Sequence, residues 1–373
     1  MIKKGFILIS IFLLVACSTP PRPITPTPFP KVSGPYQKIS INGDAPRNGI
    51  YDPTVEYKND DEGWLAYSAI EGNAQPAGPY IHTRIAQSTD RGATWRFVKT
   101  VNTSYDDTIE IVNQGAQKGV WRYEVAALVY DPTDSGREWK LFFHRYFWTE
   151  KTDRLPAYGW IGYRTASDPA GTWSDEVALF GAGQFPPAPL KTQINLNNLH
   201  ADLKNAVAYS EPGVIAINSV IYLSLTSIAK DGHDRIFLLR SDDHAKTWSY
   251  VATLLSKKEA EAFGFRYFDG SSLAQEGAGF FLLASPMKED PQHEGTMIFE
   301  FENIQRGMLK RDNGNLVVRK YILPDEKVAT NRGAGQSDYD ARNSVGGMIM
   351  PQFNSKSYPE VFGIYSTKVS LAK

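Results

Sequence analysis

The chain of 373 residues carries a formal charge of −1, and removal of residues 1–16 with their two lysines would lower it to about −3. This balance provides no basic surface for a nucleic acid, so we expect no nucleic-acid partner. The composition includes one cysteine, Cys17, and a mature domain after it would contain neither a disulfide bond nor a cysteine metal site. Aromatic residues make up 12% of the chain, a share that suits both packed sheets and sugar recognition.

Residues 1–16 have the features of a secretory signal peptide: two lysines, then an apolar run that is shorter than the roughly 20 residues of a transmembrane helix. The ending Leu14-Val15-Ala16-Cys17 resembles the lipobox of bacterial lipoproteins, which implies cleavage before Cys17 and lipidation of its thiol. Ser18 rather than Asp after the cysteine resembles lipoproteins sorted to the outer membrane. We therefore predict a lipoprotein anchored in the outer membrane by several acyl chains, facing the periplasm or the cell surface. An uncleaved membrane anchor is the alternative.

Residues 18–31 read STPPRPITPTPFPK and contain six prolines. This composition excludes a helix or a central strand and favours extended polyproline II, at roughly 3.1 Å per residue. We expect residues 17–35 to form a tether and residues 36–373 to form one domain.

A short turn pattern occurs three times in this domain, at 88–95 (STDRGATW), 167–173 (SDPAGTW) and 241–248 (SDDHAKTW). Each copy lies between two strand-like runs, which indicates a hairpin turn whose Asp side chain accepts hydrogen bonds from backbone N–H groups. The Trp begins the next strand, where it can bury a large apolar area. The residues that we expect to have these structural roles are Asp90, Trp95, Asp168, Trp173, Asp242 and Trp248.

A repeated hairpin with four strand-like runs per unit predicts the blades of a β-propeller. The first and third copies resemble the Asp-box of sialidase-type propellers, Ser-x-Asp-x-Gly-x-Thr-Trp, although the third has Ala245 in place of Gly. The second copy resembles the Ser-Asp-Pro-x-Gly-x-Trp turn of the five-bladed arabinanase, xylosidase and fructosidase glycoside hydrolases. The resemblance predicts an all-β, five-bladed propeller, with six blades as the alternative.

We expect residues 36–41 to supply the missing strand of the fifth blade and so to close the ring by pairing the two ends of the chain. Short helical segments are predicted at 196–204 and 257–263. The expected strands, blade by blade, are 53–57, 63–70, 81–87 and 96–101; 123–130, 138–147, 160–165 and 176–180; 213–217, 220–227, 235–240 and 249–255; 271–275, 279–285, 296–302 and 316–322; and 344–352 and 360–371.

Polar residues stand before or at the start of each expected inner strand. Because the inner strands of a propeller begin near one rim of the central channel, these side chains are expected to meet there. A carboxylate recurs in every blade. The residues are Asp52 in blade one, Arg122 and Glu124 in blade two, Glu211 in blade three, Asp269 in blade four, and Asp340 and Arg342 in blade five.

Glycoside cleavage needs two carboxyl groups in different environments, one protonated and one ionised. In the five-bladed hydrolases that this chain resembles, an Asp opening blade one is the base or nucleophile, and a Glu opening blade three is the acid. An Asp of blade two orients and tunes the catalytic groups. Asp52 and Glu211 match in type, whereas Glu124 stands where the family has Asp. The resemblance implies that these three residues are catalytic and that the remaining four, Arg122, Asp269, Asp340 and Arg342, bind substrate.

The predicted function is therefore that of a surface lipoprotein that hydrolyses an oligo- or polysaccharide. One alternative is a non-catalytic glycan-binding or complex-subunit lipoprotein, in which the carboxylates only cap backbone N–H groups or pair with arginines. Another is a sialidase-like exo-glycosidase, which would need three arginines and a Tyr nucleophile activated by Glu. We expect no cofactor and no metal site, since calcium in the channel has no ligand pattern in the sequence.

Overall fold

The computed structural model describes a chain of β-strands joined by turns and short helical segments. The predicted signal peptide, Cys17 and the tether up to residue 28 lie outside the described residues. These are 29–74, 78–111, 114–149, 154–182, 192–289, 292–328, 332–333, 335–354 and 362–372.

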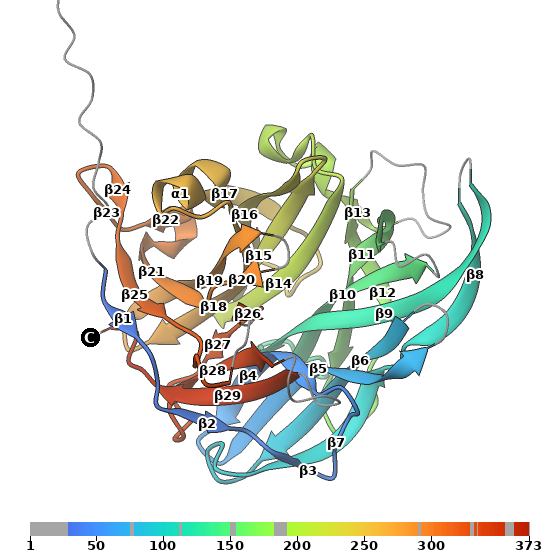
Figure 1. Ribbon diagram of the computed structural model, residues 1–373, viewed down its shortest axis with the longest axis horizontal. Coiled ribbons are helices and arrows are strands. Elements are labelled where there is room, and N and C mark those ends of the chain that lie inside the picture. Colours follow the sequence, from blue (N-terminus) through green and yellow to red (C-terminus); the bar gives the residue numbers. More distant parts are fainter. Residues whose placement is uncertain are drawn as a thin grey trace, which may run out of the picture.

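The main strands form antiparallel groups that follow one another around a common axis (Figure 1). In each of the first four groups the chain runs from an inner strand outward. The strands are β4 (Ile50–Asn59), β5 (Glu62–Ala74), β6 (Gly78–Ser88) and β7 (Trp95–Asn102) in blade one; β9 (Gly115–Tyr130), β10 (Trp139–Thr149), β11 (Arg154–Ala166) and β12 (Val177–Gly181) in blade two; β14 (Ala208–Ile217), β15 (Val220–Ala229), β16 (Gly232–Ser241) and β17 (Ser249–Ser256) in blade three; and β18 (Tyr267–Glu276), β19 (Gly279–Glu289), β21 (Thr296–Asn303) and β25 (Val318–Ile322) in blade four.

The fifth blade uses both ends of the domain. Its strands are β27 (Asp338–Tyr339), β28 (Gly347–Phe353), β29 (Phe362–Lys368) and β2 (Tyr36–Lys38), which pairs antiparallel with β29. Five shorter strands extend the blades: β1 (Lys31–Val32), β3 (Ile41–Asn42), β8 (Tyr105–Ile111), β13 (Ile194–Asn195) and β22 (Met308–Leu309). The strands β20 (Gln292–His293) and β26 (Arg332–Gly333) link blades four and five, and β23 (Arg311–Asp312) and β24 (Asn315–Leu316) form a separate hairpin.

The inner strands β4, β9, β14, β18 and β27 close a ring, because each contacts the next and β27 contacts β4. Five buried apolar clusters agree with this ring, since each one joins a different pair of adjacent blades. The second strands of the blades are buried along most of their length between these clusters, which explains apolar runs such as WKLFFHRYFWT in β10. The prediction of an all-β propeller is confirmed, and the described strands group into five blades.

The N-terminal end of the described chain lies on the propeller. Lys31 and Val32 pair in parallel with Tyr321 and Ile322 at the outer edge of blade four. The ring of Phe29 contacts Phe263 and Tyr321 at centroid distances of 6.2 and 5.6 Å. Residues 29–32, which the sequence analysis included in the tether, are therefore held against blade four.

Both helical segments predicted from the sequence are present as short elements. The first consists of the 3₁₀ turns η1 (Leu196–Asn198) and η2 (Ala201–Leu203), and a third such turn, η3 (Ile304–Arg306), follows β21. The second is α1 (Lys257–Ala262), whose N-terminus carries a capping box of Ser256 and Glu259. In the described residues there is no helix with the length and apolar character that spanning a membrane requires.

The first and third tryptophan-ended turns share one hydrogen-bond pattern. Asp90 accepts hydrogen bonds from the backbone N–H and the hydroxyl of Thr94, at 2.9 and 2.6 Å. In the third turn Asp243 accepts the same two bonds from Thr247, at 2.8 and 2.6 Å. Asp242, which the sequence analysis chose, instead pairs with Arg240 on the surface. The assignment of Asp242 was therefore wrong, because the run of two aspartates allows the motif to be aligned one residue too early.

The second turn differs, as its sequence indicated. Oδ1 of Asp168 accepts a hydrogen bond from Ala170 N at 2.9 Å, and the indole of Trp173 donates to the Pro169 carbonyl at 3.0 Å. Trp173 packs at the margin of the cluster between blades one and two, whereas Trp95 and Trp248 are buried. The three turns therefore place their tryptophans between adjacent blades.

Two of these turns contact the loop that follows the inner strand of the preceding blade. The Arg91 carbonyl accepts a hydrogen bond from Ser344 N at 2.8 Å, and His244 lies 2.8 Å from Asp131. The turns therefore lie at the rim where the inner strands end. We call this the far rim and the opposite one, where inner strands begin, the start rim.

The third turn allows a matched comparison of adjacent aspartates. We expect Asp243→Ala to lower the free energy of unfolding by about 1–3 kcal/mol, because it removes hydrogen bonds to a charged acceptor. We expect Asp242→Ala to change it by less than about 0.5 kcal/mol, as for an exposed ion pair. Urea unfolding of both variants measures the difference, and equal losses would contradict the assignment of Asp243.

Candidate active site

The inner strands carry β-bulges at the start rim, near the first residues of β4, β14 and β18 but after the tenth residue of β9. In blades one to three two residues face one on the neighbouring strand, and in blade four the register shifts around Gly270. The backbone φ angle is positive at the same place in each of the four strands, at Asp52 (47°), Val125 (52°), Glu211 (54°) and Gly270 (55°). Residues other than Gly rarely adopt this conformation, and a bulge re-aims the side chain that it carries. Asp52 and Glu211 therefore hold equivalent positions, and Glu124 stands one residue before the equivalent position in blade two.

Asp52 is buried at the start rim, with 4% of its surface exposed. Its Oδ1 accepts a hydrogen bond from the backbone N–H of Gln336 at 3.3 Å. Burial raises the pKa of Asp52 well above its ordinary value, and the negative charges of Glu124 and Asp269 raise it further. These three carboxyl groups are therefore close enough to influence one another.

Glu124 connects blade two to blade one through Tyr51. The Tyr51 hydroxyl donates a hydrogen bond to Glu124 Oε2 at 2.5 Å. Burial raises the pKa of Tyr51 well above its ordinary value, and the charges of Glu124 and Asp52 act in the same direction. The phenol therefore stays protonated and serves Glu124 as a hydrogen-bond donor.

Asp269 has surroundings of the opposite kind. Its Oδ2 lies 3.3 Å from Nε2 of His233 and 3.5 Å from Nε2 of His293. Burial acts to raise the pKa of Asp269, but the two histidines outweigh it and hold that pKa well below its ordinary value. The ionised form of Asp269 is thus favoured at the same rim where the pKa of Asp52 is raised.

Arg122 lies two residues before Glu124 and so shares its face of β9. Its guanidinium lies over the ring of Trp148, 4.4 Å from the ring centroid. The residue is buried. The Trp148 ring thus holds the guanidinium of Arg122 on the face of β9 that also carries Glu124.

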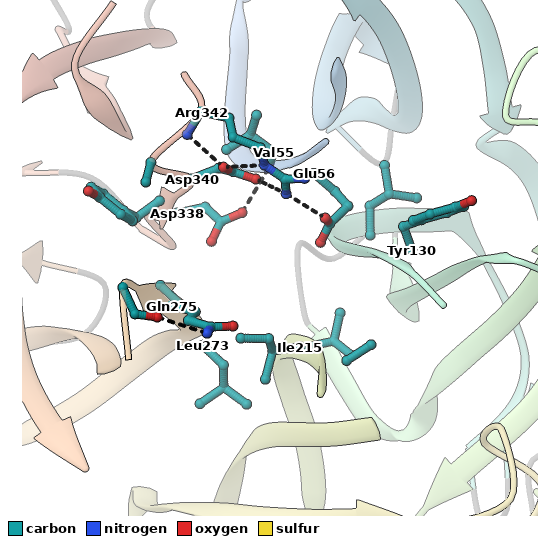
Figure 2. Close-up of a pocket in the computed structure, with 16 residues that line it drawn as sticks. Val55, Glu56, Tyr130, Ile215, Leu273, Gln275, Asp338, Asp340 and Arg342 are labelled. Atoms are coloured by element: carbon teal, nitrogen blue, oxygen red, sulfur yellow. Dashed lines mark hydrogen bonds and ion pairs between the residues drawn. The ribbon is translucent and has the colours of Figure 1, made fainter. Parts of the chain in front are cut away.

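Asp340 and Arg342 lie elsewhere, contrary to the expectation from sequence. Arg342 pairs with Asp340 Oδ2 at 2.6 Å and with Glu56 Oε1 at 3.1 Å. These three residues line a cavity of about 340 Å³ together with the later parts of the inner strands (Figure 2). Asp340 and Arg342 are therefore at the far rim.

The physical reason is the register of β27, which has only two residues. Oδ2 of Asp338 accepts hydrogen bonds from Val55 N at 2.7 Å and Thr54 Oγ1 at 3.0 Å, and Ser272 Oγ donates to its other oxygen. Asp338 is thus level with the middle of β4. Blade five places a loop, and not a strand, beside Asp52.

Sequence reasoning missed four residues of the start rim. They are Tyr51, His233, His293 and Gln336, which contact Glu124, Asp269 or Asp52. The position of Tyr51 directly before Asp52 is a signal that was available in the sequence. His233 lies in β16, His293 in β20 and Gln336 in the loop before β27, and no local pattern marks them.

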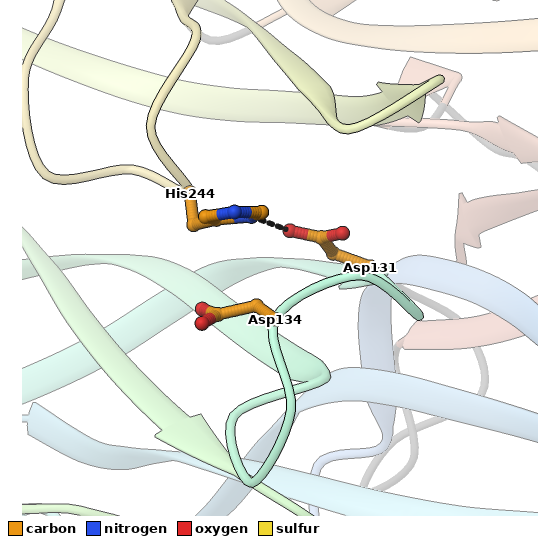
Figure 3. A group of neighbouring side chains, drawn as sticks. All are labelled: Asp131, Asp134 and His244. Carbon is orange, nitrogen blue, oxygen red and sulfur yellow. Dashed lines mark hydrogen bonds and ion pairs between the residues drawn. The ribbon is translucent and has the colours of Figure 1, made fainter.

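A second acidic group lies at the far rim, where Asp131, Asp134 and His244 bring possible metal-ligand atoms within 4.8 Å of one another (Figure 3). The ammonium group of the buried Lys140 lies 3.2 Å from Asp131 and 2.9 Å from Asp134. Lys140 therefore supplies the positive charge that these carboxylates require. The group is best understood as an ionic contact between blades two and three.

No protein family model matches this chain, and its sequence matches no curated protein. Solved structures do resemble its fold. BT0996, solved as an RGII complex, has 13% identity and a TM-score of 0.54, and the match covers 90% of this chain and 92% of that protein. A GH62 α-L-arabinofuranosidase catalytic domain from Coprinopsis cinerea has 12% identity and a TM-score of 0.51 over 90% and 96% of the two chains. A family 117 glycoside hydrolase of Zobellia galactanivorans, Zg3597, has 13% identity and a TM-score of 0.51 over 92% of each.

The chain spans a smaller part of other matches, such as 57% of the Hadza microbial sialidase Hz136, at a TM-score of 0.46. At these identities the similarity shows the fold. The chain thus has the propeller fold of glycoside hydrolases, as the resemblance of its turns predicted.

The buried Asp338 gives the stability of the protein a pH dependence. Burial raises its pKa from 3.8 to about 6, although its hydrogen bonds act to lower it. The stability that this shift contributes is complete below pH 3.8 and is lost as the pH rises through about 6. Between pH 4 and 7 we expect wild type to lose up to about 3 kcal/mol more than Asp338→Asn.

Urea unfolding at several pH values measures this difference. Asp312→Asn, at an exposed position, is the control and should follow the wild-type curve. Parallel curves for wild type and Asp338→Asn would contradict the raised pKa.

Proposed function

We propose that this protein is a glycoside hydrolase whose catalytic carboxyl groups are Asp52, Glu124 and Glu211. One observation carries the proposal. Asp52 and Glu211 occupy the same left-handed bulge position on blades one and three, at the rim where the carboxyl groups of Glu124 and Asp269 also act on Asp52. The similarity of the fold to propeller glycoside hydrolases supports an oligo- or polysaccharide substrate.

The proposed roles follow the chemistry of paired carboxyl groups. Asp52 is the base or nucleophile, and Glu211 protonates the leaving oxygen. The negative charge of Glu124 raises the pKa of Asp52. At the same rim, Asp269 accepts hydrogen bonds from sugar hydroxyls and Arg122 donates hydrogen bonds to them. Asp340 and Arg342 lie at the far rim, so they are not part of the proposed substrate-binding site. Hydrolysis by this route uses water and protein groups and needs no cofactor.

We further propose that the domain works at the outer membrane, attached through a lipid on Cys17. The support is the sequence alone: the apolar segment at 6–16, the Leu-Val-Ala-Cys ending and the proline-rich residues that follow. Such an attachment would keep the propeller near the glycans of the periplasm or the cell surface.

A sialidase-like reaction is the second candidate, and the contact between Tyr51 and Glu124 favours it. A Tyr nucleophile activated by a carboxylate is the arrangement used by that class. In this alternative Tyr51 attacks the sugar and Asp52, which retains its proton, is the acid. Loss of turnover of an aryl sialoside in Tyr51→Phe would support it, and turnover of other glycosides by that variant would exclude it.

The main test is a screen of aryl glycosides and of plant and host glycans with wild type, Asp52→Asn and Glu211→Gln. We expect each variant to lower kcat/KM by about 10²–10⁴-fold, which is the usual contribution of a general acid or base. Glu56→Gln at the far rim is the matched control and should keep nearly full activity. Unchanged turnover in both variants would remove the site. Retained glycan binding by a wild type without turnover would favour the non-catalytic alternative.

The raised pKa of Asp52 predicts the pH profile. If Asp52 must be ionised, kcat/KM falls as the pH drops below its raised pKa, so the acidic limb of the profile is shifted toward neutral pH. Glu124→Gln removes a negative charge that raises this pKa, and we expect its acidic limb to move to lower pH. Movement of the alkaline limb instead would make Asp52 the proton donor. An unchanged profile would remove the tuning role of Glu124.

A further inference from the structure

Residues 335–337 fill the place at the start rim where blade five has no inner strand. Gln336 and Ser337 are almost fully buried, each with 1% of its surface exposed. The short segment contacts three other blades: Asp52 in blade one, Pro212 in blade three and Ser285 in blade four. It therefore connects strands that do not pair with one another.

Gln336 makes two of these contacts. Its backbone N–H donates to Asp52 Oδ1 at 3.3 Å, and its side-chain Nε2 donates to the Pro212 carbonyl at 2.7 Å. Pro212 is the second residue of the bulge that begins at Glu211. One residue thus hydrogen-bonds both to Asp52 and to the bulge that carries Glu211.

The segment itself is tightly held. Ser285 Oγ donates to the Gly335 carbonyl at 2.8 Å, and the hydroxyls of Thr296 and Ser337 lie 2.6 Å apart. A Cβ atom on Gly335 would lie 2.6 Å from Asp52 Oδ1, and one on Gly270 would lie 3.1 Å from Gln336 N. There is accordingly little space for the segment to shift relative to Asp52.

The bulges need such support. A left-handed residue other than Gly costs on the order of 1–3 kcal/mol and persists only where the surroundings determine it. Asp52 and Glu211 are both residues of this kind. Hydrogen bonds from the buried Gln336 can stabilise this backbone conformation at both positions.

We propose that Gln336 is a positioning residue, which fixes Asp52 and the Glu211 bulge relative to each other from the loop that replaces the fifth inner strand. Its catalytic consequence rests on the proposed function, whereas the positioning is a property of the protein alone. The side chain of Gln336 contacts no reacting atom in this proposal and acts through Pro212.

The test compares Gln336→Met with Gln352→Met. Gln352 is also buried in blade five, but its side-chain oxygen accepts a hydrogen bond from Asp325 N and does not bridge to Pro212 as the Gln336 side chain does. Gln336→Asn is a second variant, which keeps the amide but is one methylene shorter and so breaks the contact with Pro212 with less disturbance of folding. Crystal structures of the three variants report the backbone at Glu211. Carbon-13 NMR of labelled aspartates reports the titration of Asp52, with Asp52→Asn to identify its signal.

In the Gln336 variants we expect Glu211 to leave the left-handed conformation and the pKa of Asp52 to rise, because the displaced segment weakens the hydrogen bond from the backbone N–H of residue 336 to Asp52. With an active substrate, kcat should fall about 10–100-fold with little change in KM. Gln352→Met should change none of these. An unchanged Glu211 backbone and Asp52 titration in both Gln336 variants would overturn the proposal. If wild type turns over no glycoside, the proposed function fails, and the structure and the titration still decide the positioning role.

Discussion

The left-handed bulge of the inner strands at the start rim is the constraint on which the candidate site depends. In a regular strand, side chains alternate between faces, and a bulge with one extra residue re-aims the next side chain. Asp52 and Glu211 sit at this point of the blade, each followed by a proline that has no N–H to pair. The packing around the second bulge is close, because a Cβ on Gly213 would lie 2.2 Å from the Ser271 carbonyl oxygen. Contacts between blades therefore stabilise a backbone that an isolated strand would not adopt.

The carboxyl groups of the start rim look alike in the sequence but differ in pKa, because their electrostatic surroundings differ. Asp52 faces the negative charge of Glu124, so burial and repulsion both raise its pKa. Asp269 lies near the start of the inner strand of blade four and faces His233 and His293, which hold its pKa low. Carboxyl groups with raised and with lowered pKa thus stand at one rim, and separated pKa values of this kind are typical of acid–base sites. At the far rim Arg342 pairs with Asp340 and Glu56, and burial still raises the pKa of Glu56 to about 8.

The sequence was sufficient for the features that depend on local pattern and insufficient for those that depend on register between distant segments. Apolar runs and tryptophan-ended turns predicted the propeller and most of its strands, because each blade repeats the same local signals. Asp340 and Arg342 were misplaced because β27 has two residues and begins level with the middle of β4. Asp243 was overlooked because two aspartates are adjacent in the turn. Gln336 had no signal at all, since its role comes from contacts more than 100 residues away in the sequence.

The pairing of β2 with β29 has a consequence for the order of events during synthesis. Residues 36–38 meet residues 365–367, so the last sheet combines the first and final strands of the domain. Its hydrogen bonds cannot form until almost the whole polypeptide has left the ribosome. A chain that ends before residue 362 would lack these hydrogen bonds, so the fifth blade is completed only when its last strand is present.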